Sequence, residues 1–223
     1  MAEFWRGQSH NASIEEVMLD DDAEALSKLE IPEIMSYLPH LDGRVVLELG
    51  AGIGRFTTNL AAHCRHVLAV DFMESFIKKN KEINARFRNI DYLCRDITEL
   101  SLEPERYDLI FTNWLLMYLD EQESVQLLCR ALSWLKEDGH IFIRESCYQR
   151  RGNKKLNGEN PTFYRNTSKY TEMFSNIEIE TANGTYGFRV VHSKPVFTYI
   201  KVKYNSNQIT WLLQKVLKPK GKK

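Results

Sequence analysis

Three closely spaced glycines directly follow a run of apolar residues near position 50. The run is Val45–Leu49, and the glycines are Gly50, Gly52 and Gly54. Glycines at the end of a buried strand let the backbone approach a ligand, and the N-terminus of the helix that follows faces that ligand. The order of apolar run, glycines and helical pattern therefore predicts a binding site for a nucleotide-like cofactor.

Two aspartates lie at corresponding places farther along the chain. Asp71 follows the apolar run 66–70, and Asp96 with Ile97 follows the run 90–94. A carboxylate at the first position can accept hydrogen bonds from both ribose hydroxyls, as in dinucleotide-binding folds. At the second position a carboxylate can accept from an adenine amino group, while Ile97 packs on the ring. Their order at consecutive strand ends favours an adenosine-containing cofactor.

These residues need a scaffold that brings the ends of several strands to one edge of a sheet. Apolar strand-like runs alternate with segments of helical period from residue 45 onwards. Such alternation is typical of an α/β fold whose parallel sheet is covered on both faces. The predicted strands are Val45–Leu49, His66–Val70, Ile90–Cys94, Leu109–Thr112 and Ile141–Ile143, and the predicted helices are 13–38 with a break at Pro32, Arg55–Ala62, Met73–Ala85 and Glu123–Leu135.

The chain beyond residue 150 follows a different pattern. Arg150–Asn160 is charged and rich in Gly and Asn, so we expect a loop there, and Tyr164–Phe174 is a predicted helix. Ile177–Thr181 and Phe197–Tyr204 are predicted strands, with Asn183-Gly184 as a turn signal between elements. These elements fit an antiparallel hairpin that closes the sheet.

The composition limits the classes of partner. The 223 residues suit one α/β domain, and 30 basic residues balance 30 acidic ones, which argues against nucleic acid. We assign residues 1–215 to one domain and 216–223 to a basic tail, and we expect the lysines of Lys215–Lys223 to be solvated. The widely spaced cysteines suit reduced thiols in the cytoplasm, and no apolar stretch reaches the ~20 residues of a membrane span. The histidines near Cys64 lack a fourth ligand, so no metal site is predicted.

The spacing of the glycines selects among adenosine cofactors. NAD-binding loops carry Gly-x-Gly-x-x-Gly, whereas this chain has Gly-x-Gly-x-Gly with Glu48 two residues before it. This pattern resembles motif I of the class I S-adenosylmethionine (SAM) methyltransferases. The resemblance implies a Rossmann-like α/β fold with a seven-stranded, mostly parallel sheet whose last strand is antiparallel. It also implies that Asp71 holds the ribose, that Asp96 holds the adenine, and that S-adenosylhomocysteine is the product.

A closer resemblance spans nearly the whole chain. It is to the phosphoethanolamine N-methyltransferases, above all the first of the two methyltransferase domains in plant and nematode members. The matching segments are Phe4-Trp5 with Ser9, Met18–Asp20, Leu47–Phe56, Asn113–Leu119, Arg144–Cys147, Asn160–Arg165 and Gln208 with Trp211. The resemblance implies methylation of phosphoethanolamine to phosphomonomethylethanolamine on the route to phosphocholine and phospholipids. A tandem or separate second methyltransferase domain would serve the later steps.

Single-domain protozoan members of that family differ at two positions in the acceptor region. They have an Asp and a His where this chain has Trp114 and Tyr118. A mechanism that depends on histidine is therefore not expected here, and the number of methyl groups added stays open. The acceptor amine must lose its proton, although alkylamines titrate near pKa ~10, as Lys does. We therefore expect Tyr118 to orient the amine and relay its proton.

The candidate site residues form three groups. The cofactor-binding candidates are Gln8, Ser9, Glu48, Gly50, Gly52, Gly54, Arg55, Asp71, Phe72, Asp96, Ile97 and Asn113. The catalytic candidates are Trp114, Tyr118 and Glu145. Because arginine suits bidentate phosphate contacts, the substrate-phosphate candidates are Arg144, Tyr164, Arg165 and Tyr170. Residues from about 1 to 40 are expected to form a helical lid that excludes water.

Plainer interpretations stand beside these predictions. Asp71 also suits a helix N-cap, and Asp96 also suits a turn. Tyr118 also fits a core tyrosine at a strand end, and Arg165 also fits a surface residue. An NAD-dependent oxidoreductase is disfavoured by the glycine spacing. A non-catalytic methyltransferase-like protein is disfavoured because it would not need acids at both strand ends.

Overall fold

The computed structural model describes residue 5 and residues 13–147 and 162–219. These residues form an eight-stranded sheet in the order β3-β2-β1-β4-β5-β8-β7-β6. Pairing is parallel from β3 to β5, and antiparallel between β5 and β8, β8 and β7, and β7 and β6. The strands are β1 Val45–Leu49, β2 His66–Asp71, β3 Ile90–Cys94, β4 Tyr107–Asn113, β5 Leu135–Ser146, β6 Glu178–Thr181, β7 Gly184–Pro195 and β8 Gln208–Leu217.

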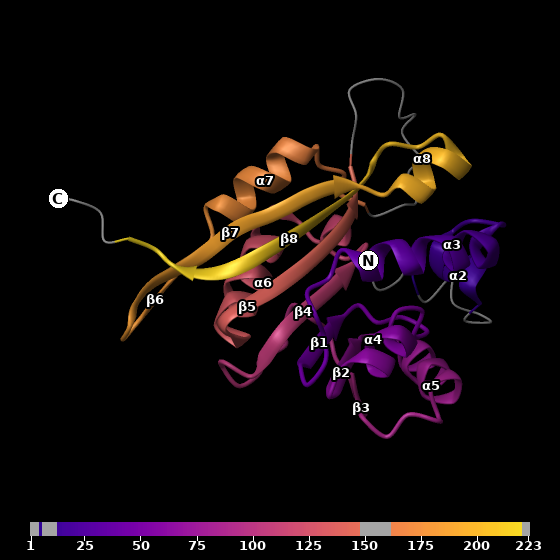
Figure 1. The fold of residues 1–223 in the computed structure, drawn as a ribbon, viewed down its shortest axis with the longest axis horizontal. Coiled ribbons are helices and arrows are strands. Elements are labelled where there is room, and N and C mark those ends of the chain that lie inside the picture. Colours follow the sequence, from indigo (N-terminus) through magenta and orange to yellow (C-terminus); the bar gives the residue numbers. More distant parts are fainter. Residues whose placement is uncertain (1–4, 6–12, 148–161, 220–223) are drawn as a thin grey trace.

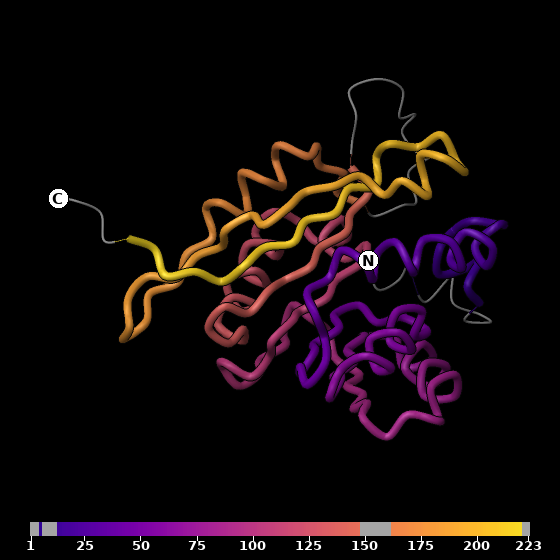
Figure 2. Tube along the Cα trace, viewed as in Figure 1, coloured from indigo at the N-terminus to yellow at the C-terminus, as the bar shows by residue number. Residues whose placement is uncertain are grey.

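Helices pack on both faces of this sheet. Figure 1 shows α6 and α7 near the strands β5, β7 and β8, and α4 and α5 beside β1–β3. The tube in Figure 2 shows the late segment 208–217 running alongside β5, far from it in sequence. The helices are α2 Ile14–Met18, α3 Ala23–Ser36, α4 Thr57–His63, α5 Glu74–Ile83, the 3₁₀ helix η1 Leu116–Tyr118, α6 Glu121–Trp134, α7 Thr167–Ser175 and α8 Phe197–Lys203.

The predicted α/β class, the five parallel strands and the antiparallel last strand are confirmed. The predicted count of seven strands is too low by one among the described residues. The strand predicted at Ile177–Thr181 is confirmed as the edge strand β6, whereas no strand was predicted where β7 and β8 lie. The turn at Asn183-Gly184 joins β6 to β7, and Gly184 has a φ of 126°, which glycine alone adopts readily. The predicted loop Arg150–Asn160 lies outside the described residues.

The predicted strand Phe197–Tyr204 is wrong, because Phe197–Lys203 forms helix α8. The backbone amides at the N-terminus of α8 have no partner within the helix, and they donate to a side chain of another element. Glu33 on α3 accepts from the backbone nitrogens of Phe197 at 2.6 Å and Thr198 at 2.8 Å. A carboxylate at a helix N-terminus stabilises the helix through these bonds and the helix dipole. No local pattern near residue 197 announces this contact, since Glu33 lies more than 160 residues earlier.

Two further predictions need correction. The expected break at Pro32 is absent in the described chain, since α3 runs through it from Ala23 to Ser36. Pro32 removes only its own backbone donor, and the buried side chains of Leu26, Glu30 and Ile34 hold the helix on the protein. Lys215 is buried within β8 and donates to the carbonyl of Leu135, so this first lysine of the expected solvated segment is not solvated.

A buried polar network fixes the glycine loop from behind. Thr57 Oγ1 donates to Glu48 Oε2 at 2.6 Å, and Asn80 Nδ2 donates to Thr57 Oγ1 at 3.0 Å. Gly54 has a φ of 92°, and a side chain there would overlap Asn80 and Asn84. Gly54 therefore allows the close approach of α5 to the loop.

In the described chain, no helix is long and apolar enough to cross a membrane.

Glu48 should make stability depend on pH. Burial raises the pKa of Glu48 to about 8 in the folded protein, from an ordinary value of 4.5. Between these values the folded state binds more protons at this site than the unfolded state, so its contribution to stability falls as pH rises. Glu48→Gln removes the titration and keeps an acceptor for Thr57. Urea denaturation at several pH values should show Glu48→Gln gaining stability relative to wild type as pH rises, and a constant difference would contradict the assignment.

Candidate active site

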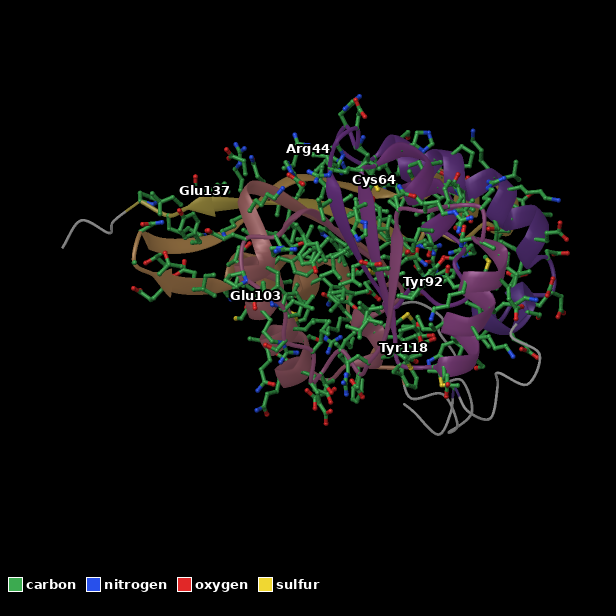
Figure 3. The ribbon with its side chains drawn as sticks, turned by 90° about the horizontal axis from the view of Figure 1, so that it is seen from below. Arg44, Cys64, Tyr92, Glu103, Tyr118 and Glu137 are labelled. Atoms are coloured by element: carbon green, nitrogen blue, oxygen red, sulfur yellow. The ribbon has the colours of Figure 1, made fainter. Side chains whose placement is uncertain are left out.

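A cavity of about 900 Å³, its open mouth included, lies at the carboxyl ends of β1, β2 and β4. Figure 3 shows Tyr118, which follows β4, at the opposite side of the molecule from Arg44, which precedes β1. The cavity is lined by Trp5, Val17, Glu48, Leu49, Gly50, Ala51, Gly52, Ile53, Arg55, Phe56, Asp71, Phe72, Phe76, Ile97, Phe111, Asn113, Trp114, Leu115 and Tyr118.

Most of the predicted cofactor residues meet in this cavity. The lining contains Glu48, Gly50, Gly52, Arg55, Asp71, Phe72, Ile97 and Asn113 from that group, together with Trp114 and Tyr118 from the catalytic group. Gln8 and Ser9 lie outside the described residues. Among the described residues, Gly54 and Asp96 are not part of the lining. Asp96 Oδ1 instead accepts from the nitrogen and hydroxyl of Thr98, each at 2.8 Å, so its contact with adenine stays a prediction.

Asp71 joins the glycine loop to the chain after β2. Its Oδ2 accepts from the backbone nitrogen of Gly52 at 2.8 Å, and its Oδ1 accepts from that of Met73 at 2.9 Å. Burial raises the pKa of Asp71 to about 6, although these hydrogen bonds oppose the rise. The group is therefore mainly ionised at neutral pH. Each carboxylate oxygen keeps a lone-pair site that a ribose hydroxyl can use.

The segment after β4 is shaped by a buried carboxylate. Glu145 accepts from the backbone nitrogens of three consecutive residues, Leu115 at 3.0 Å, Leu116 at 2.8 Å and Met117 at 3.1 Å. Burial raises the pKa of Glu145 to about 7, and the three amides oppose the rise. Both oxygens of Glu145 therefore hold η1 in place. Among the described residues Glu145 is not part of the cavity lining, and its predicted catalytic role stays a prediction.

The opposite side of η1 is held by the segment that carries the predicted phosphate residues. Arg165 donates from Nη1 to the carbonyl of Leu116 at 2.9 Å and from Nη2 to that of Leu119 at 2.7 Å. Tyr170 is fully buried against Trp211, while Tyr164 is 36% exposed. Tyr164 also lies near enough to Tyr118 to influence its pKa electrostatically. Tyr164 is the most exposed of these three side chains, none of the three is part of the cavity lining, and phosphate contacts by all three stay predictions.

Arg144 is fully buried and has its own partners. It donates from Nη1 to Asn113 Oδ1 at 3.0 Å and from Nη2 to Glu30 Oε2 at 3.1 Å. The other oxygen of Glu30 accepts from Arg55. Sequence reasoning missed Glu30, although it is the one charged residue on the buried face of α3, which was the available signal. Arg144 therefore belongs to the wall behind the cavity, and direct contact with a phosphate stays a prediction.

Tyr118 and Trp5 cover part of the cavity together. Their rings meet edge to face, with centroids 5.4 Å apart and planes inclined by 71°. Trp5 also packs on Phe76, which places one residue of the predicted N-terminal lid on the cavity. Burial raises the pKa of Tyr118 above its usual range. The Tyr118 hydroxyl therefore keeps its proton at neutral pH and can orient a ligand by hydrogen bonding.

Sequence reasoning also missed several apolar lining residues. Val17, Phe76 and Phe111 carry no signal beyond helix or strand periodicity, which is shared with the ordinary core. Within residues 5, 13–147 and 162–219, no group of three His, Cys, Asp or Glu side chains is arranged to hold a metal ion. What the cavity offers is an acidic acceptor at Asp71, a guanidinium at Arg55 and aromatic walls, a set that suits a cationic, adenosine-containing ligand with a carboxylate.

Comparisons with known proteins agree with this geometry. A profile of the family described as AdoMet dependent proline di-methyltransferase matches residues 13–186. Phosphoethanolamine N-methyltransferase 3 of Arabidopsis thaliana is 46% identical over 216 residues, which are 96% of this chain and 44% of that protein. Phosphoethanolamine N-methyltransferase 1 of Caenorhabditis elegans is 40% identical over 228 residues, covering 99% of this chain and 48% of that protein.

A solved structure is similar over the whole chain. Phosphoethanolamine N-methyltransferase 1 of Haemonchus contortus, in complex with phosphoethanolamine and S-adenosylhomocysteine, matches with a TM-score of 0.92 and 39% identity. The match covers 100% of this chain and 49% of that one. This chain thus spans about half the length of the curated relatives it matches. With its cavity at the strand ends, the chain belongs to the SAM-dependent methyltransferases of the family described as AdoMet dependent proline di-methyltransferase, and it is homologous to the phosphoethanolamine N-methyltransferases.

Proposed function

We propose that this chain methylates the amino nitrogen of phosphoethanolamine, with SAM as donor, to give phosphomonomethylethanolamine and S-adenosylhomocysteine. The observation that carries the proposal is the similarity over 100% of the chain to a nematode enzyme solved with phosphoethanolamine and S-adenosylhomocysteine. The cavity supports it, because its acidic, cationic and aromatic residues suit the parts of SAM.

The residues that would hold SAM fit its chemical groups. Asp71 would accept from the ribose hydroxyls, and Ile97 and Phe72 would flank the adenine. Arg55 Nη2 is buried at the cavity and has no hydrogen-bond partner among the described residues, so it suits the carboxylate of SAM. Gly50 and Gly52 leave room for the backbone to approach the ligand. Gln8, Ser9, Glu48, Gly54, Asp96 and Asn113 complete the proposed cofactor set.

The chain's own contribution to the reaction is alignment and exclusion of water. Bound SAM supplies a methyl group on a sulfonium, so the bond from carbon to nitrogen forms as the bond from carbon to sulfur breaks. The Tyr118 hydroxyl stays protonated, and its oxygen would accept from an amine N–H, which leaves the nitrogen lone pair free to face the methyl carbon. The proton that the ammonium form must lose would pass through this hydroxyl to water. Trp5 and Trp114 would exclude water around it. Tyr164 would contact the phosphate, with Arg165, Arg144 and Tyr170 proposed around it. Good alignment of two reactants contributes ~7–11 kcal/mol to such reactions.

A second candidate acceptor is the α-amino group of a protein that begins with proline. It is favoured by the description of the matching family as a proline di-methyltransferase. The same cavity and the same displacement would serve both acceptors, because each is an aliphatic amine. Phosphoethanolamine is preferred here because the similarity to its methyltransferases extends over 96–100% of the chain.

The organisation of the protein is proposed on the same grounds. We assign residues 1–215 to one methyltransferase domain with a lid over about residues 1–40, although β8 continues to Leu217. A second methyltransferase domain, covalently linked or separate, would carry out the later methylations.

We propose a cytoplasmic location, which suits the free thiols of the chain's four cysteines. We also propose that the partners are small molecules rather than nucleic acid.

The acceptor is tested by mass spectrometry of products from the chain with SAM. The acceptors are phosphoethanolamine, its mono- and dimethyl forms, ethanolamine, and a peptide that begins with proline. We expect turnover of phosphoethanolamine, at least ~10-fold faster than that of ethanolamine, because the phosphate adds charge-assisted hydrogen bonds worth ~1.5–3 kcal/mol. Turnover confined to the peptide would replace this proposal by the second candidate.

Asp71→Asn should weaken SAM binding about 10- to 100-fold, since a hydrogen bond to a charged group contributes ~1.5–3 kcal/mol. The pKa of Asp71 is about 6, so lowering the pH through 6 protonates the acceptor and should weaken SAM binding by the wild type. The variant should lack this dependence in calorimetric titrations. Asp108→Asn, at the other end of β4, is the control, and an equal loss in both variants would remove Asp71 from the cofactor site.

Tyr118→Phe should lower kcat about 10- to 100-fold, because misplacing a reactant by ~1 Å costs a comparable factor. SAM affinity should stay within about twofold of wild type, since the ring is kept. Tyr92→Phe, on β3 and outside the described lining, is the matched control. Steady-state kinetics that leave kcat unchanged in Tyr118→Phe would assign the hydroxyl no part in orienting the amine.

A further inference from the structure

We propose that Glu30 is a positioning residue that holds the two sides of the cavity in register, through Arg55 on the cofactor side and through Arg144 and Trp114 on the acceptor side. The inference rests on the proposed SAM site and assigns a role to a residue of the N-terminal helix α3. If the inference holds, SAM binds tightly only when α3 is packed in its place on the domain.

One carboxylate connects three elements here. Glu30 lies in α3 and is fully buried. Its Oε1 accepts from Arg55 Nη1, just after the glycine loop, and its Oε2 accepts from Arg144 Nη2, at the end of β5, at 3.1 Å. Ser27, one turn earlier on α3, lies 3.4 Å from the same Arg55 nitrogen. Helix α3 thus sets the distance between the two guanidinium groups.

The charges of this cluster do not balance within it. Two guanidinium groups share one carboxylate, and the side chains of Arg55 and Arg144 are only 7% and 0% exposed. Glu48 also acts on Arg55, but its pKa of about 8 leaves it mostly neutral at pH 7. Buried cations need an opposite charge. Arg55 Nη2, buried at the cavity without a partner among the described residues, is where an anionic ligand group would complete the balance.

The same cluster fixes the aromatic wall of the cavity. The Arg144 guanidinium lies 3.6 Å from the centre of the Trp114 ring, and the Arg55 guanidinium lies 5.3 Å from it. The indole nitrogen of Trp114 donates to Gln208 Oε1 at 2.8 Å. Trp114 has a φ of 56°, an uncommon backbone conformation that persists only where surrounding contacts impose it. Glu30 supplies that support indirectly, because it holds Arg144 against the ring.

A second carboxylate on α3 offers a matched comparison. Glu33 lies one turn later and accepts from Tyr37, Phe197 and Thr198, which attaches α3 to α8. None of these residues lines the cavity as the structure describes it. Glu33 therefore anchors the helix, whereas Glu30 contacts the groups that form the cavity wall. Replacing each glutamate with the shorter aspartate therefore distinguishes the attachment of α3 from the positioning of the cavity wall.

The test uses Glu30→Asp and Glu33→Asp in the full chain. Aspartate keeps the charge that the buried guanidiniums need, but it is shorter by about 1.5 Å, one carbon–carbon bond, and cannot reach both. Calorimetry should show SAM binding weakened about tenfold in Glu30→Asp and within about twofold of wild type in Glu33→Asp. Thermal melts accompany both titrations, so that loss of fold is measured separately from loss of affinity.

Decarboxylated SAM identifies the route through Arg55. Its affinity should change less than about twofold in Glu30→Asp, because it lacks the carboxylate that Arg55 is proposed to bind. If Glu30→Asp binds SAM as tightly as the wild type does, the proposal is overturned. It is also overturned if Glu30→Asp and Glu33→Asp lose SAM affinity equally. These titrations need no acceptor. Failure of wild-type protein to methylate phosphoethanolamine would therefore refute the proposed function and leave this test intact.

Discussion

Charged groups buried at one edge of the sheet need partners, and this constraint shapes the site. Removing an ion from water costs several kcal/mol unless hydrogen bonds or an opposite charge replace the solvent. Asp71 accepts from two backbone amides, Glu145 from three, and Arg144 donates to Asn113 and Glu30. Each of these bonds also fixes a segment of the cavity wall. The interactions that make the charges tolerable are therefore the ones that position the glycine loop, η1 and Trp114.

The N-terminal helices complete this edge. Parallel strands end in loops at the cavity, where Val17 of α2 is part of the lining and α3 packs behind Arg55. Figure 1 shows α2 and α3 beside α8, at the end of the sheet to which β4 and β5 point. Glu33 attaches α3 to α8, while Glu30 contacts the residues behind the cavity. Segments far apart in the sequence thus share one polar cluster, so the site forms only when the domain has folded as a whole.

Local patterns predicted the first half of the fold well. The strand predicted at Val45–Leu49 and that at Ile90–Cys94 have the observed bounds, because apolar runs between turn signals report burial directly. The second half was predicted less well. Phe197–Tyr204 has the composition of a strand, yet Glu33 caps its amides and makes it a helix. No strand was predicted where β7 and β8 lie; the second half of β7 is largely exposed and polar, so its strand periodicity is weak.

The sequence by itself determined the cofactor class and most of the residues at the strand ends. The glycine spacing and the acids at strand ends are each recognised within a short stretch of sequence, so they can be identified without knowledge of the fold. The tertiary structure alone decided which partners the buried charged residues have. Glu145 accepts from backbone amides, Arg165 donates to backbone carbonyls, and Arg144 donates to Asn113 and Glu30, so folding supplies partners that lie 28 to 114 residues away. Ligand contacts by these three residues stay predictions. Such pairings follow from packing in three dimensions, which residue types and spacing do not specify.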